Sequence, residues 1–250
     1  YRVLPRCFGV YDGHPVVAIE EVVVETNTMS FGDYLECRKL QLILDIFHRE
    51  GIFQELLAYL SSNNVTISGF IMDLFGHINE ATGEVQALFS DYLQEAKTEL
   101  FDSPEEARKI LSEKYQMVLD NEIGGNLVSK YSAIAWFKTL DPVLRYGVSR
   151  VKALVSKQTL GNGPTPDELE RELESIRKYH SAKIIDIVNI EREGTDVIVS
   201  LEHDIEAWRG EGYQKHLSEY GFDTYDMEND GNGKTEGFGA AREYVFYVPK

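Results

Sequence analysis

Apolar residues recur with helical spacing through the middle of this chain, from residue 30 to residue 157 of 250. One such stripe consists of Val85, Leu88, Phe89, Tyr92, Leu93, Ala96 and Leu100. Spacings of three and four place these side chains on one face of a helix. Ser30 and Asp33 have the pattern of a capping box, and Ser103 and Pro104 supply the cap and first-turn proline of a later helix. The region therefore predicts five to seven packed helices.

The first 25 residues have the pattern of β-structure instead. Arg6–Tyr11 and His14–Glu20 flank Asp12 and Gly13, a pair that a two-residue hairpin turn favours. The unbroken triplet Val22–Val24 predicts a strand covered on both faces. Two strands alone would not cover it, so we expect its neighbours upstream of residue 1 and interpret the chain as part of a longer protein.

The last 90 residues predict a small α+β unit. A Gly-Pro-containing linker precedes a charged helix that we expect to end near Tyr179. Lys183–Glu191 and Thr195–Leu201 read as two strands of a hairpin. A helix near Ile205–Tyr220 and a strand over Glu243–Val248 complete a predicted β-β-α-β order. The expected fold class is α+β, with a strand segment (1–29), a helical domain (30–160) and a small α+β domain (161–250).

Charge and composition exclude several classes of partner. The formal net charge of −17 disfavours binding to nucleic acid or to an anionic membrane. No apolar run approaches the roughly 20 residues of a membrane span. Cys7 and Cys37 are too few for a disulfide framework or a cysteine-rich metal site, which favours a reducing, cytoplasmic location.

Sequence motifs for metal or phosphate binding are incomplete. Asp226–Glu236 has the alternating oxygen ligands of a calcium loop, but its last Glu comes one position early, and a solvated loop is the favoured interpretation. Gly233–Thr235 lacks the earlier glycine that a phosphate-binding loop needs. The six histidines have no helical metal-binding spacing. No metal site and no catalytic residue is predicted in this chain.

Three segments near the N-terminus resemble one protein family. They are VVVETNT (residues 22–28), SFGDYLECR (residues 30–38) and GIFQELL (residues 51–57). Together they resemble the stretch after the catalytic core in cobalamin-binding-domain radical S-adenosylmethionine proteins. The resemblance implies an upstream barrel domain as partner and a parent protein that uses S-adenosylmethionine, a four-iron cluster and cobalamin. It also makes residues 1–29 the end of that barrel.

The chain departs from this family in its cysteines. The family holds its cluster with three closely spaced cysteines, since all but one of the irons need a protein thiolate. Cys7 and Cys37 do not supply that motif. The sequence therefore predicts an accessory C-terminal portion that caps the barrel or shapes the substrate site, without radical chemistry of its own. The alternative is a freestanding helical module that binds a protein or ligand; a calcium-binding protein is a weaker third reading.

Glu25 and Asn27 are the candidate substrate-binding residues. They follow the apolar triplet, share one side of an extended chain, and would lie at the carboxyl end of a barrel strand, where reactive chemistry is found. The other reading is structural: Thr26 and Thr28 would satisfy backbone groups, and Asn27 would cap the turn before Ser30.

Overall fold

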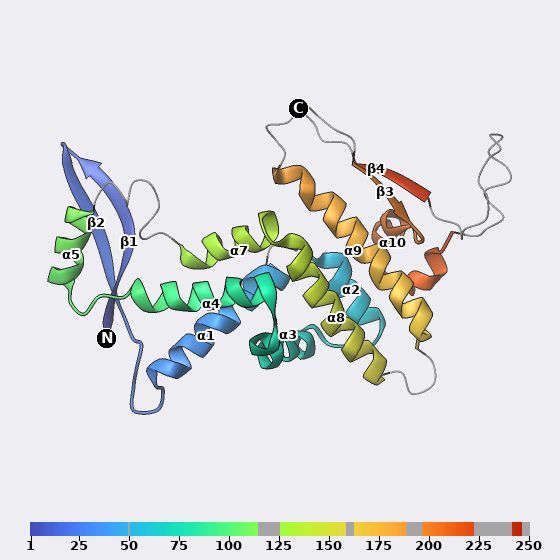
Figure 1. Cartoon of the computed structure of the whole chain (residues 1–250), viewed down its shortest axis with the longest axis horizontal. Helices are drawn as coiled ribbons and strands as arrows, with labels where there is room; N and C mark the ends of the chain where they lie inside the picture. Colours follow the sequence, from blue (N-terminus) through green and yellow to red (C-terminus); the bar gives the residue numbers. More distant parts are fainter. Residues whose placement is uncertain (50, 115–125, 159–162, 189–196, 223–241, 247–250) are drawn as a thin grey trace. The chain divides into compact units, whose positions relative to one another are not determined.

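The chain begins with a β-hairpin, as predicted. The structure is a computed structural model, and it describes all residues except 50, 115–125, 159–162, 189–196, 223–241 and 247–250. Strand β1 (Arg2–Tyr11) pairs antiparallel with β2 (His14–Val22). Asp12 and Gly13 have φ values of 50° and 77°, the positive values that a type I′ turn requires at both positions. Figure 1 shows the two strands with helix α5 beside them.

The prediction for Val22–Val24 was wrong. Strand β2 ends at Val22, so Val23 and Val24 lie beyond its last residue. Val24 is only 5% exposed, whereas Val23 is 42% exposed. A run of β-branched residues fits a strand, but here the pairing with β1 ends and the backbone turns toward α1. Among the described residues the triplet is therefore covered on one side only, and its cover by upstream neighbours stays a prediction.

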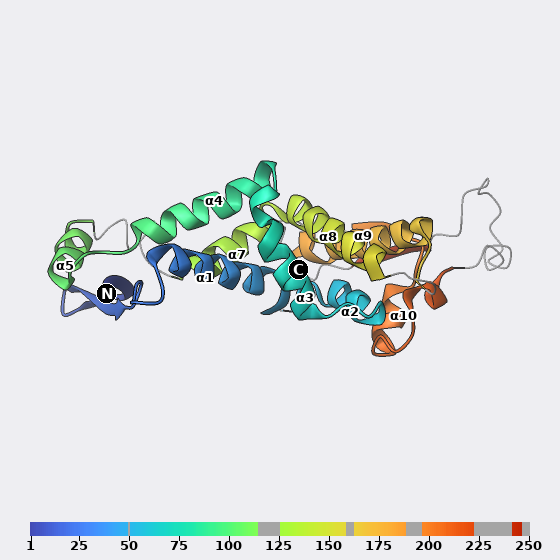
Figure 2. The same cartoon turned by 90° about the horizontal axis from the view of Figure 1, so that it is seen from below.

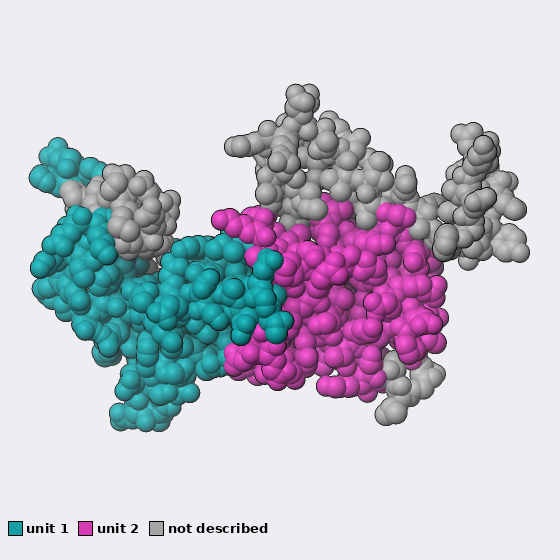
Figure 3. Space-filling model, in the orientation of Figure 1, with its two compact units in different colours: residues 1–46, 82–135 teal, residues 47–81, 136–250 magenta. Residues whose placement is uncertain are grey.

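The described residues divide into two compact units, which Figure 3 shows in different colours. Unit 1 is Tyr1–Ile46 with Thr82–Ala135, and unit 2 is Phe47–Ala81 with Trp136–Lys250. Each unit combines two separate stretches of chain, whereas the division predicted from the sequence was contiguous. Among the described helices, none is long and apolar enough to cross a membrane.

Unit 1 combines the hairpin with helices from residues 31–46 and 82–135. They are α1 (Phe31–Leu44), α4 (Gly83–Thr98), α5 (Pro104–Glu113) and most of α7 (Leu127–Phe137). Helix α1 packs against α4, and α5 packs against the hairpin, where Val3, Ala107 and Leu111 form a small core. The capping box of Ser30 and Asp33 is present, and Ser103 accepts the N–H of Glu106, so both predicted helix starts are confirmed.

Unit 2 contains the remaining elements. They are most of the π-helical turn η1 (Asp45–Arg49), α2 (Gln54–Ser62), α3 (Ile67–His77), η2 (Ile78–Glu80), α8 (Leu140–Gln158), α9 (Pro166–Val188), β3 (Val197–Leu201), α10 (Ile205–Gly210), η3 (Leu217–Tyr220) and β4 (Arg242–Phe246). Helices α8 and α9 lie side by side in Figures 1 and 2. Arg150 on α8 donates two hydrogen bonds, of 2.7 and 2.9 Å, to the carboxylate of Asp73 on α3. This bidentate pair joins the two helices.

The predicted hairpin of residues 183–201 was wrong. Helix α9 continues to Val188, so the first predicted strand is helical over residues 183–188. Strand β3 instead pairs antiparallel with β4, from Val197 opposite Phe246 to Leu201 opposite Arg242. The predicted helix near Ile205–Tyr220 is also shorter, because α10 ends at Gly210. The fold class is α+β and mainly helical, as predicted.

Candidate functional site

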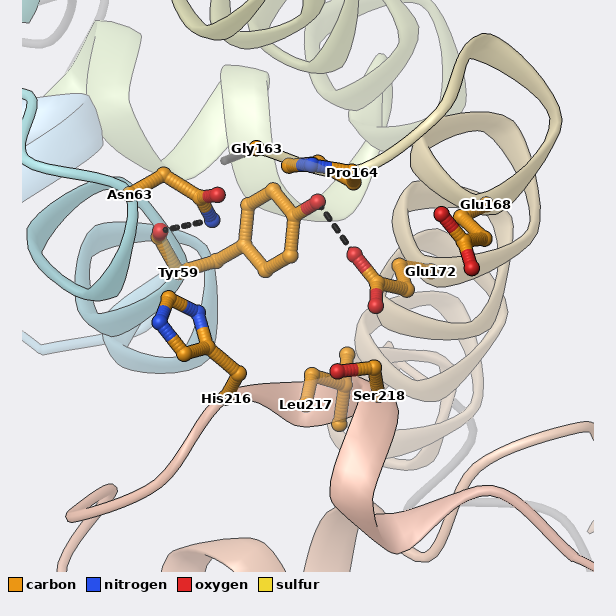
Figure 4. Close-up of a pocket in the computed structure, with 9 residues that line it drawn as sticks. All are labelled: Tyr59, Asn63, Gly163, Pro164, Glu168, Glu172, His216, Leu217 and Ser218. Carbon is orange, nitrogen blue, oxygen red and sulfur yellow. Dashed lines mark hydrogen bonds between the residues drawn. The ribbon is translucent and has the colours of Figure 1, made fainter. Parts of the chain in front are cut away.

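Unit 2 contains a small polar cavity of about 190 Å³. Its walls come from α2, the residues just before α9, the first turns of α9, and η3 (Figure 4). The lining residues are Tyr59, Asn63, Gly163, Pro164, Glu168, Glu172, His216, Leu217 and Ser218.

A short hydrogen bond between Tyr59 and Glu172 crosses one side of the cavity. The Tyr59 hydroxyl donates to Oε2 of Glu172 at 2.5 Å, and both side chains are buried. Burial raises the pKa of Tyr59, and the carboxylate of Glu172 raises it further. Burial likewise raises the pKa of Glu172, the charge of Glu168 adds to this, and the bond from Tyr59 opposes it. The tyrosine therefore keeps its proton and serves as a donor to the carboxylate.

Glu168 brings a second carboxylate to the same side of the cavity, one turn before Glu172. Its Oε2 accepts the backbone N–H of Thr165 at 2.7 Å, and the Thr165 hydroxyl accepts the N–H of Glu168 at 3.3 Å. This is the reciprocal capping box that starts α9. The hydrogen bond from the Thr165 backbone lowers the pKa of Glu168, which therefore stays ionised at neutral pH.

The opposite wall is formed by η3. Leu217 is buried there, and its sequence neighbours His216 and Ser218 also line the cavity (Figure 4). The chain that enters this wall is fixed by the buried Trp208 of α10, whose indole N–H donates to the carbonyl of Lys215 at 2.9 Å. Three separate segments of unit 2 are thus needed to build the site.

A second polar cluster lies around Glu55 of α2, which is fully buried. Lys183 and Arg209 approach its Oε1 at 3.2 and 3.9 Å, and Nε2 of His180 lies 3.6 Å from its Oε2. Burial, and then the charge of Lys183, lower the pKa of His180 to about 3, so the ring is neutral. Two cations thus balance the buried carboxylate, which is a structural role. In the described part of the chain, no three His, Cys, Asp or Glu side chains are arranged to hold a metal ion.

The predicted site residues Glu25 and Asn27 lie in unit 1, in the segment between β2 and α1. Both are exposed. The hydroxyl of Thr26 accepts the backbone N–H groups of Thr28 and Met29 at 3.2 and 3.1 Å, and Ser30 caps α1. Neither predicted residue lines the cavity described above. Their role in substrate binding stays a prediction. The loop Asp226–Glu236 lies wholly outside the described residues.

The sequence analysis missed Tyr59 and Glu172, although a signal for Glu172 was present. Leu169, Leu173 and Ile176 are buried at helical spacing, and Glu172 falls within this stripe. A carboxylate on the apolar face of a helix is an exception to the usual pattern and calls for a partner. Its partner lies 113 positions away in the sequence, so periodicity alone does not identify Tyr59.

Comparison with known proteins gives no match: no family model, no curated protein and no solved structure is significantly similar to this chain.

Proposed function

We propose that this chain is the C-terminal accessory portion of a cobalamin-dependent radical S-adenosylmethionine enzyme. In this role it caps the upstream barrel or shapes the substrate site. The resemblance of residues 22–57 to that family carries the proposal. The partners are then the upstream barrel domain and a small-molecule substrate.

The number of cysteines indicates whether this chain can hold the four-iron cluster. Cys37 is exposed on α1, and Cys7, the only other cysteine of the sequence, is on β1. Two thiols do not meet the three-cysteine requirement of the cluster, so the residues present do not fit it. Under this proposal the cluster, S-adenosylmethionine and cobalamin belong to the upstream region, and this chain performs no radical step.

A freestanding ligand-binding module is the second candidate function. One observation favours it: the described residues that line the cavity between α2, α9 and η3 all belong to unit 2. A pocket in which a few polar groups converge beside apolar and aromatic side chains, here Tyr59, Pro164 and Leu217, is the usual form of a small-molecule site.

Two experiments separate the candidates. The first determines the coding sequence upstream of residue 1; three cysteines in the C-x-x-x-C-x-x-C spacing support the accessory role. A start codon that leaves no room for a barrel refutes it and supports the freestanding module. In the second, this chain and the longer protein are each treated anaerobically with iron and sulfide. We expect stoichiometric iron only in the longer protein, and stoichiometric iron in this chain contradicts the proposal.

A further inference from the structure

The cavity of unit 2 contains a carboxylate oxygen that accepts no hydrogen bond from a described residue. Glu172 is only 4% exposed. Its Oε2 accepts the Tyr59 hydroxyl, but no hydrogen bond from a described residue reaches its Oε1. Figure 4 shows this second oxygen pointing away from Tyr59, toward the side of the cavity formed by Leu217 and Ser218. A donor bound in the cavity can reach this oxygen, and a hydrogen bond to a charged group is stronger than one between neutral groups.

The charges around the cavity favour a positively charged donor. Glu168 and Glu172 both line it, whereas none of the nine lining residues is Lys or Arg. Glu172 also has no Lys, Arg or His nitrogen within ion-pair distance among the described residues. His216 and Arg171 favour its ionised form only through space. An anion would meet two carboxylates here, while a cation would provide the missing counter-charge.

The shape and chemistry of the walls favour an organic cation over a metal ion. The ring of Tyr59, Pro164 and Leu217 give the cavity apolar surface, which a bare ion does not use. An aromatic ring is also a favourable neighbour for an alkylammonium group. A calcium ion takes six to eight oxygen ligands, and one oxygen of Glu172 is already occupied by Tyr59. The volume of about 190 Å³ suits a small molecule.

We infer that this cavity binds a small organic cation, a primary ammonium compound whose nitrogen donates to Oε1 of Glu172. The hydroxyl of Ser218 and the carboxylate of Glu168 lie on the cavity wall as further acceptors. Tyr59 holds Glu172 in place by its hydrogen bond and closes one side. The inference goes beyond the proposed function and does not depend on it, because every group involved belongs to this chain.

The test uses three compounds of nearly equal size and different charge. Ethanolamine is a cation at pH 7.5, ethylene glycol is neutral, and glycolate is an anion. Each is titrated into the full chain at constant ionic strength, and binding is followed by saturation-transfer NMR. We expect saturable binding of ethanolamine with a dissociation constant in about the millimolar range, as its few heavy atoms allow. We expect no saturable binding of the other two.

Glu172→Gln is the decisive variant. The amide oxygen still accepts the hydrogen bond from Tyr59, but the negative charge is removed. Ethanolamine should bind at least about tenfold more weakly, because its charged partner is gone. The matched control is Glu170→Gln on the same helix, an exposed residue that pairs with Lys152 and does not line the cavity. Its affinity should stay within about twofold of the parent chain.

Circular dichroism establishes that each variant is folded. If Glu172→Gln does not fold, Glu168→Gln takes its place, and a loss of about threefold is expected for this more exposed carboxylate. Binding of ethanolamine that is absent, equal to that of ethylene glycol, or unchanged by Glu172→Gln, or by Glu168→Gln where that variant takes its place, overturns the inference. Calcium chloride is titrated in parallel: calcium binding that requires Glu172, with no ethanolamine binding, would also overturn it in favour of a metal site.

Discussion

The hydroxyl of Tyr59 donates a 2.5 Å hydrogen bond to the carboxylate of Glu172, which joins α2 to α9 inside unit 2. Both side chains are buried. A hydrogen bond to a buried charged group contributes more to stability than one between neutral groups. This bond therefore serves two purposes: it connects two helices, and it orients the carboxylate toward the cavity.

Replacing Tyr59 by Phe should lower the free energy of unfolding by about 1–3 kcal/mol at pH 7.5. The change removes the donor and leaves Glu172 buried without a partner. The hydrogen bond lowers the pKa of Glu172, so the variant takes up a proton at higher pH than the parent. Its deficit should therefore shrink as the pH falls through the titration of this carboxyl group.

Urea unfolding at pH 7.5 and pH 5 measures this effect. Tyr220→Phe is the matched control, because its hydroxyl also donates to a glutamate, Oε2 of Glu211 at 2.8 Å, but both groups are more exposed. The control should change stability by less than about 0.5 kcal/mol. Equal losses in the two variants would show that burial of the Tyr59 bond is unimportant.

Gly147→Ala should destabilise unit 2 by about 1–2 kcal/mol, although alanine favours a helix. A Cβ at Gly147 on α8 would lie 2.8 Å from Cε1 of Phe47. Phe47 is buried and contacts the rings of Phe53 and Phe70, so its ring has little room to move. The close approach of α8 to this ring therefore requires glycine.

Gly76→Ala on α3 is the opposite case, since a Cβ there would meet no atom within 4 Å. We expect it to stabilise by about 0.5–1 kcal/mol through helix propensity alone. Thermal and urea unfolding compare the two variants. A stabilising Gly147→Ala would contradict the packing described for α8.

The buried histidines should make unit 2 less stable in mild acid. Burial lowers the pKa of His180 to about 3 and that of His203 to about 4. Unfolded histidines titrate near 6.5, so below this pH the unfolded chain binds more protons than the folded one. Stability should thus fall as the pH drops from about 6.5 toward 4, by up to about 1.4 kcal/mol per pH unit for each histidine.

Urea unfolding at pH 7.5, 6 and 5 tests this dependence. His180→Gln should have a shallower decrease than the parent chain, because one of the two buried rings is gone. His48→Gln, at an exposed position, should leave the pH dependence parallel to the parent. Parallel curves for His180→Gln as well would mean that His180 takes up its proton equally in the folded and unfolded chain.

Under the proposed function, Glu25 and Asn27 are predicted substrate contacts of the longer protein. Glu25→Gln and Asn27→Ala should each lower its turnover at least tenfold, about 1.4 kcal/mol, and change stability by less than about 1 kcal/mol. Both residues are exposed within this chain, which agrees with a small effect on stability. Glu21→Gln on β2 is the control and should leave turnover unchanged. Normal turnover in the two variants would return the segment to a purely structural role.

Local signals in the sequence determined where most elements begin. Ser30 with Asp33, Ser103 before Pro104, and the Asp12–Gly13 turn act through neighbouring backbone groups, so each was readable from a few consecutive residues. The stripe of α4 was readable for the same reason, because one helix face needs only its own spacing. These features do not depend on which distant segment the chain meets.

Tertiary structure alone decided the rest. The isoleucine-rich run after residue 183 fits a buried helix as well as a strand, and periodicity does not distinguish the two over so short a length. Strand β3 pairs with β4, which begins more than 40 residues after β3 begins, instead of with its sequence neighbour. Likewise, the sequence shows that Glu172 is a charged residue among the buried apolar residues of α9. Only the packing of α2 against α9 brings Tyr59 to it. The physical reason is common to all three: a buried group or strand edge needs a partner, and the partner is chosen by three-dimensional proximity.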